Sequence, residues 1–174
     1  QLRLYGIPEA ISAAVCSFDT LEGAVNTTIS TIQMGIPVAR IELLDEVRVD
    51  AINQYSDFNY PLKPTLFFEF HGTKAWVKEQ SELVKEISSD EGGSDFKWSL
   101  HEQERQKLWE ARHNAYYAGL AMRPGTKGWA TDVCVPISRL AECILETRQD
   151  IDQEGLTVPI VGHVGDGNFH LLFM

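Results

Sequence analysis

Two histidines near the end of the chain have the residue types and spacing of a metal site. His163 and His170 flank Gly-Asp-Gly-Asn in the stretch IVGHVGDGNFHLLF, residues 160–173. Glycine, aspartate and asparagine tolerate the positive φ angles of a tight turn, so we expect a hairpin in which His163 directly faces His170. Opposed residues in such a pair have Cβ atoms about 4.5–5.5 Å apart, and neutral imidazole is a common ligand of Zn, Mn and Fe. The stretch predicts two ligands of one divalent metal ion.

A second interpretation remains open, in which the two histidines form a partly exposed cross-strand pair that binds no metal. Two protein ligands make an incomplete site, because a catalytic metal normally has three and keeps one open position. Asp166 lies at the tip of the expected turn and is expected to shape it.

The elements that must position these histidines alternate along the chain. Apolar and alternating runs predict strands, and amphipathic runs predict helices, with Asp19 as a capping residue and Asp45 as the start of the second helix. The expected strands cover 10–18, 36–44, 65–72, 94–99 and 127–135, with two more flanking the turn. The expected helices cover 19–35, a segment from 45, 73–93, 100–122 and 138–153. This order predicts an α+β fold of ferredoxin-like type, with an antiparallel sheet, helices mainly on one face, and one domain over residues 1–174.

Composition excludes some classes of partner. The formal net charge of −10 would repel nucleic acid and anionic membranes. The longest apolar runs, such as 65–70, are strand-sized and far shorter than a membrane-spanning helix. Three cysteines without a CxxC spacing argue against a disulfide framework and favour a reducing compartment, and residues 1–10 lack the pattern of a signal peptide. Since the chain ends inside the apolar run FHLLFM, we expect the domain to be truncated at its C-terminus.

Several motifs together carry a resemblance. GHVGDGNFH (162–170), with LWEARHNAYYA (108–118) and TDVCVPISRL (131–140), resembles the FAD-dependent D-lactate dehydrogenases of the vanillyl-alcohol-oxidase superfamily. The similarity continues through PVARIELLDEV (37–47) and LFFEFHG (66–72). It implies that residues 1–174 are an incomplete FAD-linked oxidase C-terminal domain, the substrate domain. The FAD would be bound mainly by an N-terminal domain that is absent from this chain.

The resemblance also assigns roles. It implies that His163 and His170 bind a divalent metal (Mn, Zn or Fe), and that the third ligand, a Glu, and the catalytic base, a His, lie beyond Met174. Arg112 would bind the substrate carboxylate, for which a planar guanidinium is suited, and Lys127 would contact or steer the same anion. An ordinary solvated helix arginine and an ordinary loop lysine are the alternatives. Asn168 is expected to hold the hairpin and is a further candidate contact to substrate or flavin.

The implied activity is oxidation of D-lactate to pyruvate, with electrons passing through FAD to a cytochrome or quinone. Tyr116 and Leu172 stand where relatives acting on D-2-hydroxyglutarate carry hydroxyl or polar groups. Because an aromatic and an apolar side chain cannot pair with a second carboxylate, Tyr116 and Leu172 favour D-lactate or a slightly larger D-2-hydroxyacid as the substrate. Alternatives are a related flavoenzyme acting on glycolate or D-2-hydroxyglutarate, or a non-catalytic module for metal binding or dimerisation.

The isolated chain is expected to be inactive, and its cut strand edge could form a homodimer. The compartment is not fixed by the sequence. The resemblance implies a mitochondrial protein in a eukaryote, and a cytoplasmic or inner-membrane-peripheral protein in a bacterium.

Overall fold

The computed structural model describes residue 4 and residues 6–174. Residues 1–3 and 5, which belong to the stretch without a signal-peptide pattern, lie outside the described residues. Eight strands are described, and all their pairings are antiparallel. The strands are β1 (Ala10–Phe18), β2 (Val38–Leu44), β3 (Thr65–Gly72), β4 (Gly93–Ser99), β5 (Trp129–Ala130), β6 (Val133–Cys134), β7 (Ile160–Gly162) and β8 (Asn168–Phe173).

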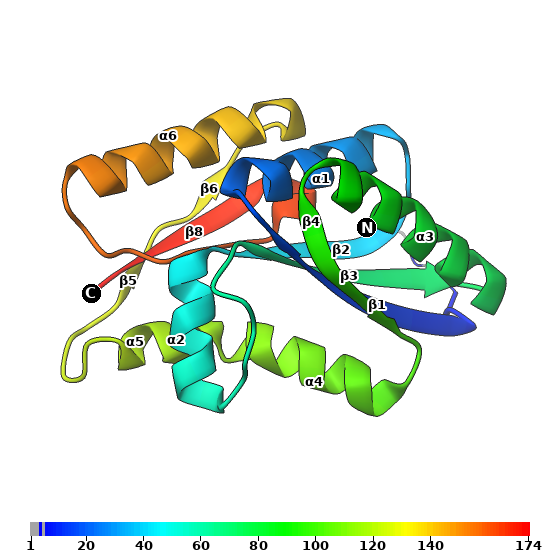
Figure 1. Cartoon of the computed structure of the whole chain (residues 1–174), viewed down its shortest axis with the longest axis horizontal. Helices are drawn as coiled ribbons and strands as arrows, with labels where there is room; N and C mark the ends of the chain where they lie inside the picture. The colour runs from blue at the N-terminus through cyan, green and yellow to red at the C-terminus, as the bar shows by residue number, and fades with distance from the viewer. Residues whose placement is uncertain (1–3, 5) are drawn as a thin grey trace.

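The sheet has the strand order β4-β1-β3-β2-β7-β8-β5, and β6 also pairs with β8. The first four strands, with α1 (Leu21–Gln33) after β1 and α3 (Lys74–Asp90) after β3, have the ferredoxin-like order. β7 and β8 extend this unit past β2, so β7 lies beside a strand more than a hundred residues earlier in the chain (Figure 1). The predicted α+β class with an antiparallel sheet is confirmed.

Helices cover both faces of the sheet. The three longest, α1, α3 and α6 (Leu140–Gln153), lie together on one face, as expected, above the larger apolar cluster (Figure 1). The other face, expected to be less covered, carries α2 (Glu46–Ser56), α4 (Glu102–His113) and α5 (Ala115–Ala121). Helices cover this face because the sheet is apolar here too, and Phe67 on this face is only 1% exposed. Burying such an aromatic side chain contributes about 2–3 kcal/mol.

Strand alternation decides which face each residue reaches. Along β3, Phe68 and Phe70 enter the first core, whereas Phe67 enters the second. Along β8, Leu171 packs in the first core, and its neighbours His170 and Leu172 line a cavity on the opposite face. The site residues discussed below therefore lie on the face covered by α2, α4 and α5.

Some local expectations were wrong. Thr20, and not Asp19, caps α1: its hydroxyl accepts a hydrogen bond from Gly23 N (3.0 Å), whereas Asp19 pairs with Lys63. Asp45, where the second helix was expected to start, caps α2 and accepts from Arg48 N at 2.8 Å.

Two long predicted elements are each divided. The helix expected over 100–122 breaks at Asn114 into α4 and α5; Asn114 there donates to Ser56 Oγ (3.2 Å) of α2. The strand expected over 127–135 is split into β5 and β6. Between them, Thr131 N donates to the Leu171 carbonyl oxygen and the Thr131 hydroxyl oxygen accepts from Leu171 N.

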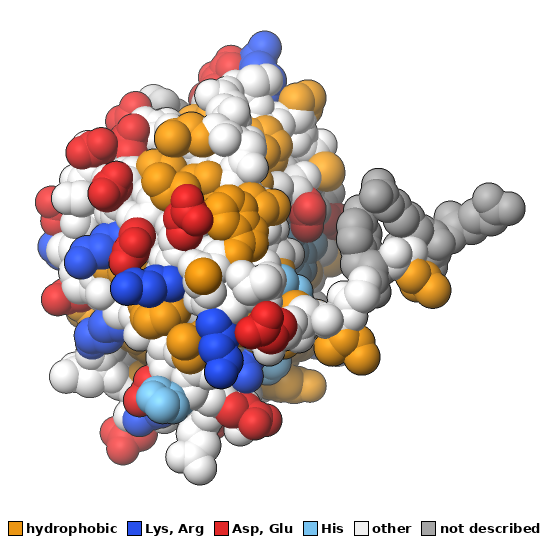
Figure 2. Space-filling view, turned by 90° about the vertical axis from the view of Figure 1, so that its right-hand side faces the viewer, with side chains coloured by type: hydrophobic (Ala, Val, Ile, Leu, Met, Phe, Trp, Pro, Cys, Tyr) orange, Lys and Arg blue, Asp and Glu red, His pale blue; other side chains and the backbone are white. Residues whose placement is uncertain are grey.

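Charges on the face shown in Figure 2 are mixed, with acidic and basic side chains interspersed among apolar ones. Among the described residues, no helix has the length and apolar character needed to cross a membrane.

Candidate active site

Glu42 of β2 is a buried carboxylate that binds two predicted site residues. Its Oε2 accepts a hydrogen bond from Arg112 Nε (2.9 Å), and its Oε1 accepts one from His163 Nδ1 (2.8 Å). The β2–β7 register pairs Leu43 with Gly162, so the next step of the same register brings Glu42 and His163 together. With Glu42 only 5% exposed, its charge is balanced by the Arg112 guanidinium rather than by water.

The two predicted metal ligands are close together. The ring centroids of His163 and His170 are 5.8 Å apart, with the ring planes at 87°. His170 Nδ1 donates to the Thr131 carbonyl oxygen (2.8 Å), as His163 Nδ1 donates to Glu42. A neutral imidazole that donates from Nδ1 carries its lone pair on Nε2. In the described part of the chain, neither Nε2 atom has a hydrogen-bond partner.

The expected register of the hairpin was wrong. His170 pairs with Val161, not with His163. The chain leaves β7 after Gly162 and makes a short 3₁₀ turn over Val164–Asp166 before Gly167, whose φ is +75°. That left-handed conformation, with the Val135 carbonyl oxygen against the Gly167 backbone, favours glycine at this position. His163 is thus close to His170 although it lies at the start of a turn and is not paired with His170 in the sheet.

The residues present fit a metal ion as two of its ligands. Histidines that bind metals usually donate their second ring N–H to a carboxylate or backbone carbonyl, and His163 and His170 do so here. Over the described residues, no group of three or more His, Cys, Asp or Glu side chains is placed to hold a metal.

A cavity of about 280 Å³ joins these groups to the substrate residues predicted from the sequence. Arg112, His163 and His170 contribute polar groups, and Tyr116 and Leu172 lie on its wall. The full lining is Arg48, Arg112, Ala115, Tyr116, Ala130, Val161, His163, His170, Leu171 and Leu172. An anion-binding group, two potential ligands and an apolar wall therefore share one small cavity.

Two other predicted residues are not in the cavity lining. Lys127 is an exposed residue of the loop before β5. Asn168 donates from Nδ2 to Asp132 Oδ1 (2.7 Å) and to the Val133 carbonyl oxygen (2.9 Å). Asn168 thereby holds the link before β6 against β8; these side-chain bonds do not cross the β7–β8 hairpin.

Sequence reasoning missed Glu42 and Arg48. Arg48 is buried at 1% exposure, lines the cavity, and donates from Nη1 to the Ala115 carbonyl oxygen at 2.6 Å. A signal for both exists in the sequence. Glu42 interrupts an apolar strand, and Arg48 falls three residues after Asp45 and four before Ile52, on the helical face that is buried.

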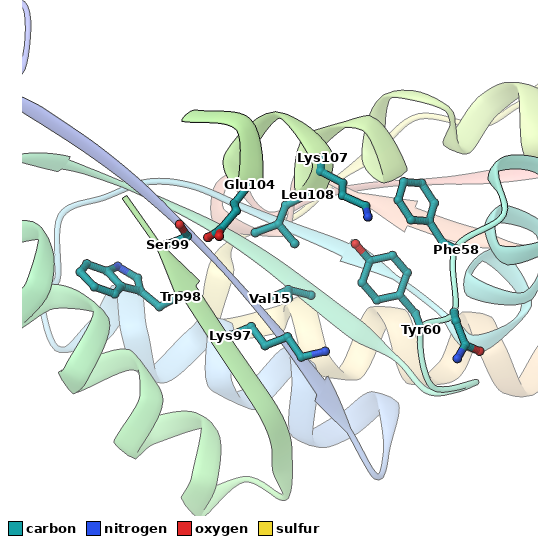
Figure 3. A pocket seen from close by; sticks show the side chains of 10 residues that line it. Val15, Phe58, Tyr60, Lys97, Trp98, Ser99, Glu104, Lys107 and Leu108 are labelled. Atoms are coloured by element: carbon teal, nitrogen blue, oxygen red, sulfur yellow. The ribbon is translucent and has the colours of Figure 1, made fainter. Parts of the chain in front are cut away.

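A second, larger cavity of about 340 Å³ lies beneath α4 (Figure 3). Phe58, Tyr60 and Leu108 give it an apolar wall, and Lys97 and Lys107 are its basic residues. It contains no histidine and none of the predicted site residues. We place the chemistry in the cavity of about 280 Å³, because it brings together Arg112, His163 and His170.

Comparison with known proteins agrees with this architecture. Residues 7–174 match the family model of FAD linked oxidases, C-terminal domain, and the chain belongs to this family.

Individual relatives in this family carry more specific names than the family model does. The chain is 51% identical over 173 residues to a zebrafish (Danio rerio) protein named probable D-lactate dehydrogenase, mitochondrial, covering 99% of this chain and 35% of that protein. It is 43% identical to an Arabidopsis thaliana D-lactate dehydrogenase [cytochrome], mitochondrial, covering 99% and 30%. The chain thus spans about a third of these relatives. An alkyldihydroxyacetonephosphate synthase structure shares the fold, with a TM-score of 0.67 at 13% identity, over 97% of this chain and 37% of that one.

Proposed function

We propose that this domain is the substrate domain of a flavin-dependent D-2-hydroxyacid dehydrogenase that oxidises D-lactate to pyruvate. The observation that carries the proposal is the convergence of Arg112, His163 and His170 on one cavity, with Glu42 binding the first two. The names of the relatives support D-lactate as the substrate.

Arg112 would bind the substrate carboxylate. Its Nε is bound to Glu42, while its two Nη atoms have no hydrogen-bond partner among the described residues. A carboxylate can therefore take both Nη donors in a bidentate pair. The bond from Nε to Glu42 restrains the guanidinium, which would help to orient the bound carboxylate.

His163 and His170 would direct their Nε2 lone pairs to a divalent metal, Mn, Zn or Fe. The metal, when bound, would lower the pKa of the substrate's 2-hydroxyl group, and FAD would accept the hydride from C2. Glu42 and the Thr131 carbonyl oxygen keep both rings in the required tautomer. The apolar wall around Leu172 favours a substrate with a short side chain.

The rest of the proposal concerns the full-length protein. A preceding domain would bind most of the FAD, a third metal ligand and the base would come from outside residues 1–174, and a cytochrome or quinone would take the electrons. A mitochondrial location follows if the source is a eukaryote, since the relatives' names include it.

The test uses the full-length protein with its flavin under anaerobic conditions. Flavin absorbance is followed after addition of D-lactate, L-lactate or glycolate. The proposal predicts rapid bleaching by D-lactate and much slower bleaching by L-lactate. If glycolate bleaches the flavin fastest, the protein is the related glycolate-oxidising enzyme. If none of the three compounds does so, the dehydrogenase proposal is wrong.

A further inference from the structure

Arg48 is a buried cation without an anionic partner. Among the described residues, no carboxylate oxygen lies within 4 Å of its guanidinium; Nη1 has one backbone acceptor and Nε has none. Burial lowers the pKa of Arg48 to about 10, with Asp45 opposing and Arg112 adding to the shift, so the group stays protonated at neutral pH. A buried and unpaired charge is costly, and an anion that reached it would gain a strong interaction.

The two arginines of the cavity differ in charge balance. The charge of Arg112 is neutralised by Glu42. Arg112 therefore offers its Nη atoms as hydrogen-bond donors but adds little net positive charge to the cavity. Asp45, whose charge acts on Arg48 from the start of the same helix, is engaged instead by Arg48 N, Ile160 N and Arg148 Nη1. The excess positive charge of the cavity therefore lies at Arg48.

The same residues differ in depth. The side chain of His163 is 49% exposed and that of Arg112 is 17% exposed, whereas Arg48 is 1% exposed. Arg48 lies against Gly119 of α5 and close to Leu172, since a Cβ atom at Gly119 would overlap both side chains. Arg48 is thus the most deeply buried of the charged residues that line the cavity.

A substrate held as proposed would direct its side chain inward. With the carboxylate on Arg112 and C2 near the histidines, the remaining carbons extend past Tyr116 and Leu172. The methyl group of D-lactate is too short to pair with Arg48. A longer side chain that ends in a carboxylate would supply the missing anion.

We propose that Arg48 is a specificity-determining residue that binds a second carboxylate, so that the enzyme accepts 2-hydroxy dicarboxylates in addition to D-lactate. This inference rests on the proposed dehydrogenase function. Arg48 would pair with the second carboxylate, for which Tyr116 and Leu172 offer no charged partner.

The test compares substrates that differ only at the far end of the side chain. D-2-hydroxyglutarate and D-2-hydroxyvalerate have the same five-carbon chain, as D-malate and D-2-hydroxybutyrate have the same four-carbon chain. In the full-length holoenzyme, Arg48→Met is expected to lower kcat/KM for the better dicarboxylate by about 10- to 100-fold and to change that of its methyl-ended partner by less than about threefold. Arg48→Lys should retain part of the preference, and Arg139→Met, at an exposed arginine, should change neither value.

A binding measurement on the wild-type holoenzyme does not depend on the variants or on turnover. Glutarate should raise the melting temperature more than pentanoate does at equal concentration. The inference is overturned if D-lactate is oxidised but Arg48→Met affects both members of a pair equally, or if glutarate stabilises no more than pentanoate. If D-lactate is not oxidised but glutarate stabilises the protein through Arg48, the proposed function fails and the anion site stands.

Discussion

Glu42 and His163 are 121 positions apart in the chain, yet Glu42 Oε1 lies 2.8 Å from His163 Nδ1. The β2–β7 pairing creates this contact, and the second oxygen of the same carboxylate binds Arg112. One buried residue therefore sets both the tautomer of a potential metal ligand and the orientation of a potential carboxylate-binding group.

Replacement of Glu42 should weaken both functions. In Glu42→Gln the amide cannot balance the Arg112 charge and is a poorer acceptor for His163 Nδ1–H. We expect metal affinity and kcat/KM for D-lactate of the full-length enzyme to fall by about 10- to 100-fold. Metal titration and steady-state kinetics measure this, with Glu82→Gln, at an exposed glutamate, as the control. Unchanged values for Glu42→Gln would show that this carboxylate does not support the site.

Replacement of Arg112 should act mainly on substrate binding. Arg112→Lys keeps the charge but loses the planar fork and the Nε bond to Glu42. The KM for D-lactate should rise by about 30-fold or more, with a smaller change in kcat. Saturation kinetics separate the two parameters, and Arg139→Lys serves as the control. A fall in kcat at constant KM would assign Arg112 to another step.

Gly119 offers a test of packing around Arg48. Glycine to alanine in an exposed helix normally stabilises by about 1 kcal/mol. Here an added Cβ atom would overlap Arg48 Nη1 and Leu172 Cδ2, so Gly119→Ala should destabilise the protein by about 1–3 kcal/mol. Chemical unfolding measures the change. Gly6→Ala, where the added atom meets open space, should be nearly neutral. An equally or more stable Gly119→Ala protein would contradict the described packing.

The cysteines should differ in reactivity. Burial raises the pKa of Cys16 to about 11, so the folded protein favours its thiol form and the reactive thiolate is scarce at neutral pH. Cys134 is exposed. Iodoacetamide at pH 8 should therefore modify Cys134 well before Cys16, and peptide mass spectrometry would show it. Cys16 should react readily only after unfolding or as the pH approaches 11. Equal labelling of both in the folded state would argue against the burial of Cys16.

The sequence predicted those parts of the molecule that depend on local patterns. Alternating and amphipathic runs placed the strands and helices, and the type and spacing of His163 and His170 identified the potential ligands. The register of their hairpin was wrong because residues 164–167 form a 3₁₀ turn with Gly167 at positive φ, which composition alone does not distinguish from a two-residue hairpin turn.

The groups that complete the site depend on contacts distant in sequence. Glu42 became a site residue only through β2–β7 pairing, and Arg48 only through the packing of α2 on α5. A single sequence shows that these two charged residues lie among apolar ones, but it does not show which cavity they face. The number of helices on the second face was also underestimated. Phe67 and Phe68 are neighbours in the sequence, but their rings pack in different cores on opposite faces of the sheet.

We propose that His163 and His170 hold a divalent metal that D-lactate oxidation requires. The most direct measurement is anaerobic flavin bleaching by D-lactate in the full-length protein, before chelation, after chelation, and after a divalent metal is restored. We expect bleaching that is lost on chelation and recovered with the metal, and no such recovery in a His163→Ala, His170→Ala variant that retains its flavin. Bleaching that proceeds unchanged after complete removal of the metal would contradict it.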